Sequence, residues 1–312
     1  MASMDMFLGL EQFEHEYIQF SSFQNGLNQI ENAITTFRKT KIADNLRILG
    51  ESGSGKTTLC QLVKGKYPRQ VLKEQDIVPV LVVPVPSSVT IGSLIDAIFL
   101  ELQYPIETKG TTSRRSAILI DLCIALKVEM IIFDEAQHLH DRGQAKTHYM
   151  VADWLKTLMD ALSIPMVLVG LPNLEKLLQV NEQLRRRFSK KLYLALGQDA
   201  ALPIQNECAI LFHSLQEVLP LPFQSSESSM GEFYNRLYFA CDGRIAYLKK
   251  LMLGALRMAL ENNLAYITPL EFELAFKHLI WWEGEKALNP FHADFEFRRL
   301  DRANEPFEKD AF

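Results

Sequence analysis

The sequence feature that most restricts the fold of this chain is residues 50–57, which read GESGSGKT and match the pattern G-x-x-x-x-G-K-T. A short apolar run, residues 46–49, precedes this segment, and a helical pattern follows Lys56. Glycines let the backbone wind closely round an anion, so that successive N–H groups and the N-terminus of the next helix point at phosphate groups. The pattern therefore predicts a strand, a phosphate loop and a helix within an α/β nucleotide-binding domain.

The residue types in this loop indicate ATP and Mg²⁺ as the ligands. Lys56 would bring a positive charge to the β- and γ-phosphates, and the hydroxyl of Thr57 would bind magnesium. We expect the nucleotide to contact a continuous run of residues: Gly50, Glu51, Ser52, Gly53, Ser54, Gly55, Lys56, Thr57 and Thr58.

A second motif supplies two acidic groups. Apolar residues 130–133 come directly before Asp134 and Glu135. We expect Asp134 to hold Mg²⁺ through water, and Glu135 to orient and polarise the attacking water. Aspartates also end strands simply as turn residues, but a phosphate loop in the same chain favours the catalytic interpretation. Kinases and simple GTPases need no glutamate beside this aspartate, so Glu135 favours hydrolysis of ATP.

Apolar runs alternate with helical patterns up to about residue 197. This alternation predicts an α/β domain whose parallel sheet is covered by helices on both faces. We expect strand 166–169 to lie between the two strands that carry the motifs, and strand 78–85 to lie at an edge because of Pro79 and Pro84. The five expected strands are residues 46–49, 78–85, 128–133, 166–169 and 191–196.

Valine-rich strands stop after about residue 200, and helical patterns follow, which predicts a small all-helical lid. The last part of the chain is charged and lacks clear periodicity, so we expect an extended or partly disordered tail. The lid helices are expected at residues 206–218, 228–241, 245–262 and 269–280. The predicted domains are an N-terminal helical segment (1–40), the nucleotide-binding domain (41–200), the lid (201–283) and the tail (284–312).

Further candidates would sense or stabilise the γ-phosphate. Asn173 is the amide nearest the end of strand 166–169 and is the candidate first sensor. Arg187 is our first choice, and Arg186 our second, for an arginine presented to a neighbouring protomer's nucleotide. The alternative is a solvated basic face. Arg244, at the start of a lid helix, would act as a second sensor, unless it is a surface residue behind a helix cap.

Composition limits the possible partners and compartments. The net charge of −5 does not draw the whole molecule to nucleic acid, so any DNA contact must be local. The four cysteines form no C-x-x-C pair, which argues against a disulfide framework or a zinc knuckle. No apolar stretch approaches the roughly 18 residues of a membrane span, and no export signal is evident. We expect a cytoplasmic protein with no membrane partner.

Together these motifs resemble the TnsC/TniB family of AAA+ transposition regulators. The likeness covers roughly residues 10–283 and rests on the phosphate loop, IFDEAQHL at 132–139, VLVG at 167–170, LRRRF at 184–188 and the pair Gly243 and Arg244. It implies an AAA+ ATPase with a five-stranded parallel sheet and a helical lid. It also implies homo-oligomers, as rings or helical filaments, that form on double-stranded DNA and link a TniQ-like target selector to a DDE transposase. ATP hydrolysis would control assembly and disassembly, and some relatives serve CRISPR-associated transposons.

The resemblance also implies DNA contacts in residues 109–115, which read KGTTSRR. Lys109 and Thr111 match the family positions, and Arg114 and Arg115 are our own extension of the site. These residue types suit contacts to phosphates without base readout, which predicts sequence-tolerant and salt-sensitive binding. The alternative is a capped helix start with exposed arginines.

Other functions remain open on the sequence alone. One is an ATP-dependent signalling or scaffold switch that assembles with protein partners without DNA. Another is an initiator-type loader of the same superfamily, which would normally carry a dedicated DNA-reading domain. No helix-turn-helix is evident, which weakens this reading. Leu171 stands where relatives commonly have threonine, which leaves the first sensor open.

Overall fold

The computed structural model describes residues 20–105, 110–141, 145–198, 202–225 and 230–308. The chain forms two compact units, which are described in turn. The α/β unit comprises Phe23–Ser52 and Lys56–Leu194. Within the described residues, the helical unit comprises residues 20–22, Gly53–Gly55 and residues 195–308.

A five-stranded sheet with the order β4-β5-β6-β1-β7 organises the α/β unit. All its neighbouring strands are parallel, as predicted. Strand β6 lies between the two motif-bearing strands β1 and β5, and β4 lies at an edge, so both expectations about strand order are confirmed. The strands are β1 (Leu46–Leu49), β4 (Val80–Pro84), β5 (Met130–Asp134), β6 (Met166–Gly170) and β7 (Lys190–Tyr193).

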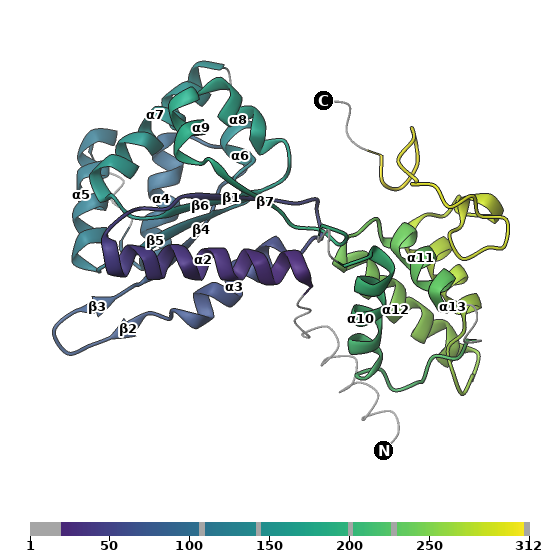
Figure 1. The fold of residues 1–312 in the computed structure, drawn as a ribbon. Coiled ribbons are helices and arrows are strands. Elements are labelled where there is room, and N and C mark those ends of the chain that lie inside the picture. Colours follow the sequence, from purple (N-terminus) through teal and green to yellow (C-terminus); the bar gives the residue numbers. More distant parts are fainter. Residues whose placement is uncertain (1–19, 106–109, 142–144, 199–201, 226–229, 309–312) are drawn as a thin grey trace. The chain divides into compact units, whose positions relative to one another are not determined.

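Helices cover both faces of this sheet, because the strand residues are apolar on both sides (Figure 1). On one face lie α2 (Ser21–Thr40) and α3 (Lys56–Lys66). Helix α2 comes near α3 at Gly26, where an added Cβ would lie 3.1 Å from the Leu59 side chain. The other face packs against α4 (Ile91–Glu101), α5 (Thr112–Ala125), α7 (Ala145–Leu162) and α8 (Leu174–Val180).

Short elements complete the α/β unit. Helix α6 (His138–Asp141) follows β5, and helix α9 (Glu182–Arg187), which was not predicted, precedes β7. An antiparallel hairpin of β2 (Gln70–Val71) and β3 (Asp76–Ile77) projects beyond α3 (Figure 1). Within the described residues, no helix combines the length and apolar character that crossing a membrane requires.

The helical unit contains helices near each of the positions expected for the lid. They are α10 (Ile204–Gln216), α11 (Met230–Cys241), α12 (Ile245–Glu261) and α13 (Pro269–Ala275), with a π-helical turn η2 (Phe276–Ile280) and a short η3 (Lys286–Leu288). Aromatic rings fill its centre, where the centroid of Phe212 lies 5.0 Å from that of Phe223 and 5.2 Å from that of Phe233. Such edge-to-face packing stabilises the unit beyond simple burial of area.

The tail differs from expectation, because residues 284–308 pack on the helical unit instead of extending into solvent (Figure 1, yellow). Phe291, Phe295 and Phe307 are buried. The Arg236 guanidinium of α11 donates to the carbonyls of Pro290 and His292 at 2.7 and 2.6 Å. The expectation relied on periodicity, which irregular segments lack even when their aromatic residues are buried.

The contact between α12 and η2 provides a test of packing in the helical unit. A Cβ added at Gly254 would lie 2.9 Å from the Ala275 Cβ and 2.3 Å from Leu279 Cδ1. We expect Gly254→Ala to lower the free energy of unfolding by about 1–3 kcal/mol, because overpacking outweighs the better helix propensity of alanine. Denaturant unfolding followed by circular dichroism measures it.

Gly231 of α11 is the matched control, because nothing lies within 4 Å of a Cβ added there. Gly231→Ala should leave the free energy of unfolding unchanged or raise it by up to about 1 kcal/mol. Equal effects of the two substitutions would contradict the packing argument.

Candidate active site

The phosphate loop joins the end of β1 to the start of α3. Its glycines Gly53 and Gly55 have φ values of +78° and +91°, in the left-handed region that favours glycine. The Lys56 side chain is buried at 5% exposure, and its Nζ donates to the carbonyls of Gly50 and Glu51, both at 2.9 Å. Burial lowers the pKa of Lys56, while the nearby carboxylates of Glu135, Asp134 and Glu51 act in the opposite direction.

The Ser54 hydroxyl gives a test of whether this loop suits a phosphate. Ser54 is 1% exposed, and its Oγ has no hydrogen-bond partner among the described residues. A buried hydroxyl without a partner is costly, and an anion seated in the loop would supply one. The loop therefore fits a nucleotide phosphate.

Asp134, the last residue of β5, meets the first turn of α3. Its carboxylate is 5% exposed and accepts a hydrogen bond from the Thr57 hydroxyl. Burial raises the pKa of Asp134, and the bonds from Thr57 and from the Glu135 backbone N–H, at 2.9 Å, oppose that shift. A hydroxyl beside a carboxylate is the hard-oxygen donor set that Mg²⁺ prefers, so these side chains fit the predicted metal site.

Glu135 is held by a residue that the sequence did not single out. Gln137 is 2% exposed, and its amide nitrogen donates to the Glu135 carboxylate. Its amide oxygen accepts from the Leu171 backbone N–H at 3.1 Å, just after β6. A Cβ at Gly170 would lie 2.7 Å from that amide oxygen, so the glycine that ends β6 makes room for the link.

The hydrogen bonds of Gln137 indicate what Gln137 and Glu135 could each do. Gln137 ties the ends of β5 and β6 together and orients the carboxylate that would polarise water. Glu135 itself has a φ of 55°, an uncommon conformation for a residue other than glycine and one often found at functional sites. An amide two positions after the motif was the available signal, but its burial could not be read from the sequence.

Asn173, the candidate first sensor, lies at the N-terminus of α8. It follows β6, whose neighbours β1 and β5 lead into the phosphate loop and Asp134. Because carboxyl ends of parallel strands share one edge of a sheet, the topology brings Asn173 to the edge that carries the loop. Its side chain is half-buried.

The two finger candidates differ in their surroundings on α9. Arg187 is 31% exposed and pairs with Asp160 of α7 at 2.5 Å. Arg186 is 76% exposed and pairs with Glu182, one turn earlier on the same helix, at 2.7 Å. Phe188 is buried at 1% exposure and anchors the end of α9. Exposed ion pairs contribute little free energy, so either arginine can leave its partner at small cost.

The residues predicted for DNA contact surround the start of α5. The Thr111 hydroxyl caps this helix by accepting from the Arg114 backbone N–H at 3.3 Å. The Arg114 side chain is exposed, whereas the Arg115 guanidinium pairs with Asp96 of α4. Lys109 lies outside the described residues.

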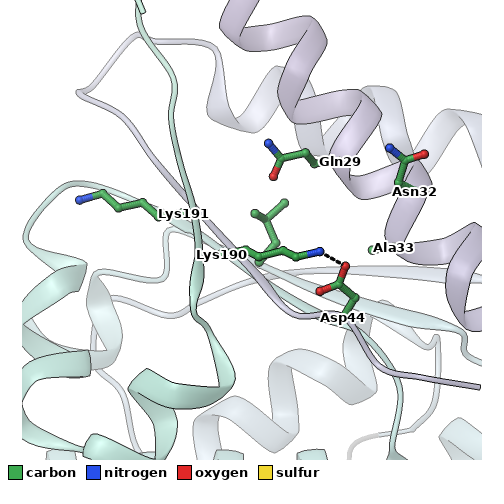
Figure 2. A pocket seen from close by; sticks show the side chains of 7 residues that line it. Gln29, Asn32, Ala33, Asp44, Lys190 and Lys191 are labelled. Carbon is green, nitrogen blue, oxygen red and sulfur yellow. Dashed lines mark hydrogen bonds and ion pairs between the residues drawn. The ribbon is translucent and has the colours of Figure 1, made fainter.

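A separate hollow of about 390 Å³ lies between α2 and the first residues of β1 and β7 (Figure 2). Its lysines are already paired, Lys190 with Asp44 and Lys191 with Glu175. It is at the amino ends of the strands, whereas the phosphate loop follows the carboxyl end of β1. This hollow is therefore separate from the candidate nucleotide site at the phosphate loop.

Comparison with protein families decides what kind of chain carries this geometry. The family model described as "Bacterial TniB protein" matches residues 10–194. The chain belongs to the bacterial TniB family. This family comprises transposition ATPases of the TnsC/TniB type, so the resemblance noted from the motifs is confirmed. No curated protein matches the chain in sequence.

Solved structures share the fold of this TniB-family chain. Cdc6p from Pyrobaculum aerophilum matches with a TM-score of 0.62 and 14% identity, over 85% of this chain and 69% of its own. The ADP form of ORC2 from Aeropyrum pernix matches with a TM-score of 0.59 and 15% identity, over 86% and 72%. At such identities the likeness shows the fold, that of AAA+ ATPases. Family and fold together make the TniB-family chain an ATPase.

The hydrogen bonds of Gln137 lead to a kinetic prediction. Gln137→Met keeps the length of the side chain but removes both bonds, so Glu135 loses its orientation. We expect kcat for ATP to fall about tenfold, with the dissociation constant for ATP nearly unchanged. Steady-state hydrolysis and calorimetric titration measure the two quantities.

Glu135→Gln gives the lowest kcat expected among the variants of this experiment. It should retain nucleotide binding and lose at least about 100-fold in kcat, because no group remains to accept the proton of water. A Gln137→Met variant with the turnover of the unmodified protein would show that Glu135 does not depend on the link.

Proposed function

We propose that this TniB-family ATPase binds ATP with Mg²⁺, assembles on double-stranded DNA as a ring or helical filament, and links a TniQ-like target selector to a DDE transposase. The observation that carries the proposal is the Glu135 carboxylate, which Gln137 orients at the edge of the sheet that bears the phosphate loop and Asp134. A chain that only bound nucleotide would not need an oriented carboxylate there.

The chain's own residues divide the work of hydrolysis. Lys56 would exchange the carbonyls of the loop for the β- and γ-phosphates. Thr57 and Asp134 would hold Mg²⁺, which would supply positive charge to neutralise the phosphate oxygens. Glu135 accepts a proton as water attacks the γ-phosphorus and the bond to ADP breaks. Asn173 and Arg244 are the proposed first and second sensors of the γ-phosphate.

Arg187, or failing that Arg186, would complete the site of a neighbouring protomer. An arginine supplied in trans accelerates phosphoryl transfer by about 10³–10⁵ fold. Both side chains reach solvent from α9, and each pairs with a surface carboxylate, Arg187 with Asp160 and Arg186 with Glu182. Hydrolysis would then require assembly, which gives the nucleotide control over the oligomer.

Duplex DNA is the proposed partner of the segment at the start of α5. Arg114 is exposed there, and Thr111 presents its backbone at a helix N-terminus, a position that favours phosphates. Arg115 would have to leave Asp96 to take part. ORC1 from Aeropyrum pernix, solved in complex with DNA, matches this chain with a TM-score of 0.58 and 12% identity, over 84% of this chain and 66% of its own.

Assembly on DNA is the central test. We expect particles whose mass grows with duplex length in the presence of ATP or a nonhydrolysable analogue, and not with ADP. Mass photometry and negative-stain microscopy at low salt measure the particles. Assemblies of unchanged size with and without DNA would support a protein-only scaffold switch and contradict the proposal.

Arg114→Ala tests whether DNA is bound at the start of α5. The slope of log affinity against log salt should fall by about 1, because one phosphate contact is lost. Arg257→Ala removes the same charge from an exposed site on α12 and should leave the slope unchanged. Equal effects of the two variants would indicate a response to total charge and not a DNA site near α5.

Mixing two inactive variants tests the arginine in trans. Arg187→Ala keeps Glu135, and Glu135→Gln keeps Arg187, so a mixed interface can combine both intact groups. We expect each variant alone to be inactive, and an equal mixture to recover about a quarter of the turnover, since random mixing pairs the intact groups at that fraction of interfaces.

Arg186→Ala in place of Arg187→Ala, mixed in the same way, identifies which arginine acts. No recovery with either arginine variant would contradict a role in trans. Nucleotide affinity of the isolated protomers should stay nearly constant throughout, which separates this role from ordinary nucleotide binding.

A further inference from the structure

The corner between α11 and α12 holds an unusual pair of arginines. Asp242 and Gly243 both have positive φ values, 50° and 69°, and bring the chain sharply to Arg244. Asp242 is nearly inaccessible, with its side chain 5% exposed. Its carboxylate faces two guanidinium groups, Arg244 at the corner and Arg299 from the tail.

Arg299 takes both oxygens of this carboxylate. Its Nε donates to Oδ1 of Asp242 at 2.5 Å, and a terminal nitrogen donates to Oδ2 at 2.7 Å. These bonds raise the pKa of Arg299. A two-pronged arginine–carboxylate contact of this kind is among the strongest and most directional ion pairs in proteins.

Arg244 is left with a weaker set of contacts. Its terminal nitrogen is 3.4 Å from Oδ2 of Asp242, and its Nε has no hydrogen-bond partner in the described part of the chain, although the side chain is only 12% exposed. The guanidinium lies over the rings of Tyr247 and Phe307, at 5.5 and 5.4 Å from their centroids. Aromatic faces hold a cation in place without satisfying its N–H groups.

Hydrogen bonds within the tail keep two of its residues, Arg299 and Phe307, in place. The Phe307 backbone N–H donates to the Leu300 carbonyl at 3.0 Å. Arg298 donates to the Glu305 carboxylate at 2.8 Å, which closes the same turn. Phe307 has no exposed surface and packs edge-on against Tyr247. Residues 298–307, named here the tail clamp, therefore act as one folded element.

The start of α12 also contacts the phosphate loop within the helical unit. The Ala246 backbone N–H, two residues after Arg244, donates to the Gly53 carbonyl at 3.0 Å. An added Cβ at Gly53 would lie 2.8 Å from the Ala246 Cβ. Arg244 thus begins the same helix that reaches the loop.

We propose that Arg299 and Phe307 are positioning residues that keep Arg244 available to the γ-phosphate, so that the tail clamp sets the rate of ATP turnover. The inference rests on the proposed role of Arg244 as the second sensor. Arg299 occupies both oxygens of Asp242, and without it the buried carboxylate would draw Arg244 into a close ion pair. Phe307 keeps the guanidinium in place through its ring while leaving Nε open to a ligand.

Point variants of the full chain test this inference. Arg299→Ala should lower kcat about tenfold, because an arginine paired closely with Asp242 is no longer available to the γ-phosphate. Affinity for ADP, which lacks that phosphate, should stay within about twofold of the unmodified protein. Arg302→Ala removes the same charge from an exposed position of the tail clamp and should turn over ATP normally.

The double variant Arg244→Ala/Arg299→Ala separates positioning from general damage. If Arg299 acts through Arg244, the double variant should turn over ATP as slowly as Arg244→Ala alone, and not slower. Arg299→Lys should recover part of the rate, because lysine can make one of the two bonds. Phe307→Leu, which keeps apolar volume but removes the ring, carries the same test if Arg299→Ala does not fold.

The outcomes distinguish the inference from the function on which it rests. Normal turnover of Arg244→Ala would remove Arg244 from the site, and the inference with it. A slow Arg244→Ala together with a normal Arg299→Ala, or losses that multiply in the double variant, would overturn the tail clamp alone. Thermal melting of every variant confirms that the comparison is made on folded protein.

Discussion

Lys56 and Asp134 are opposite charges that the α/β unit buries at one edge of its parallel sheet, each with 5% of its surface exposed. Burial lowers the pKa of the lysine and raises that of the aspartate, so it disfavours the charged form of both. Loop carbonyls and the Thr57 hydroxyl offset part of this cost. Phosphates and a cation would offset more, so nucleotide binding should stabilise the folded unit.

The strand order makes this arrangement possible. With β6 between β1 and β5, the chain segments that follow all three strands meet at one edge. Gly170 ends β6 without a side chain, and the space is used by Gln137, which reaches the Glu135 carboxylate and the Leu171 backbone. A single missing Cβ therefore connects the topology of the sheet to the orientation of the Glu135 carboxylate.

Much of this fold was predictable because strong local patterns encode it. The phosphate loop and the apolar strands predicted the parallel sheet and the place of β6, and the prolines at the two ends of β4, Pro79 and Pro84, predicted its edge position. Gln137 escaped prediction because its importance depends on burial between two strand ends. The tail escaped because Phe295 and Phe307 carry no periodicity, and their burial depends on helices far away in the sequence.

Glu135 and Arg244, two side chains of the proposed mechanism, are held in contrasting ways. Gln137 holds Glu135 from two positions away, within residues 10–194, which the family model matches. Arg244 faces Asp242. Arg299, which is 57 positions further along the sequence, holds this aspartate, and both residues lie beyond the part of the chain that the family model matches. A carboxylate that accepts a proton must keep one orientation, so a local bond suits it. An arginine that senses a phosphate must be able to change partners, and a distant segment can alter its availability without disturbing the residues that bind the nucleotide.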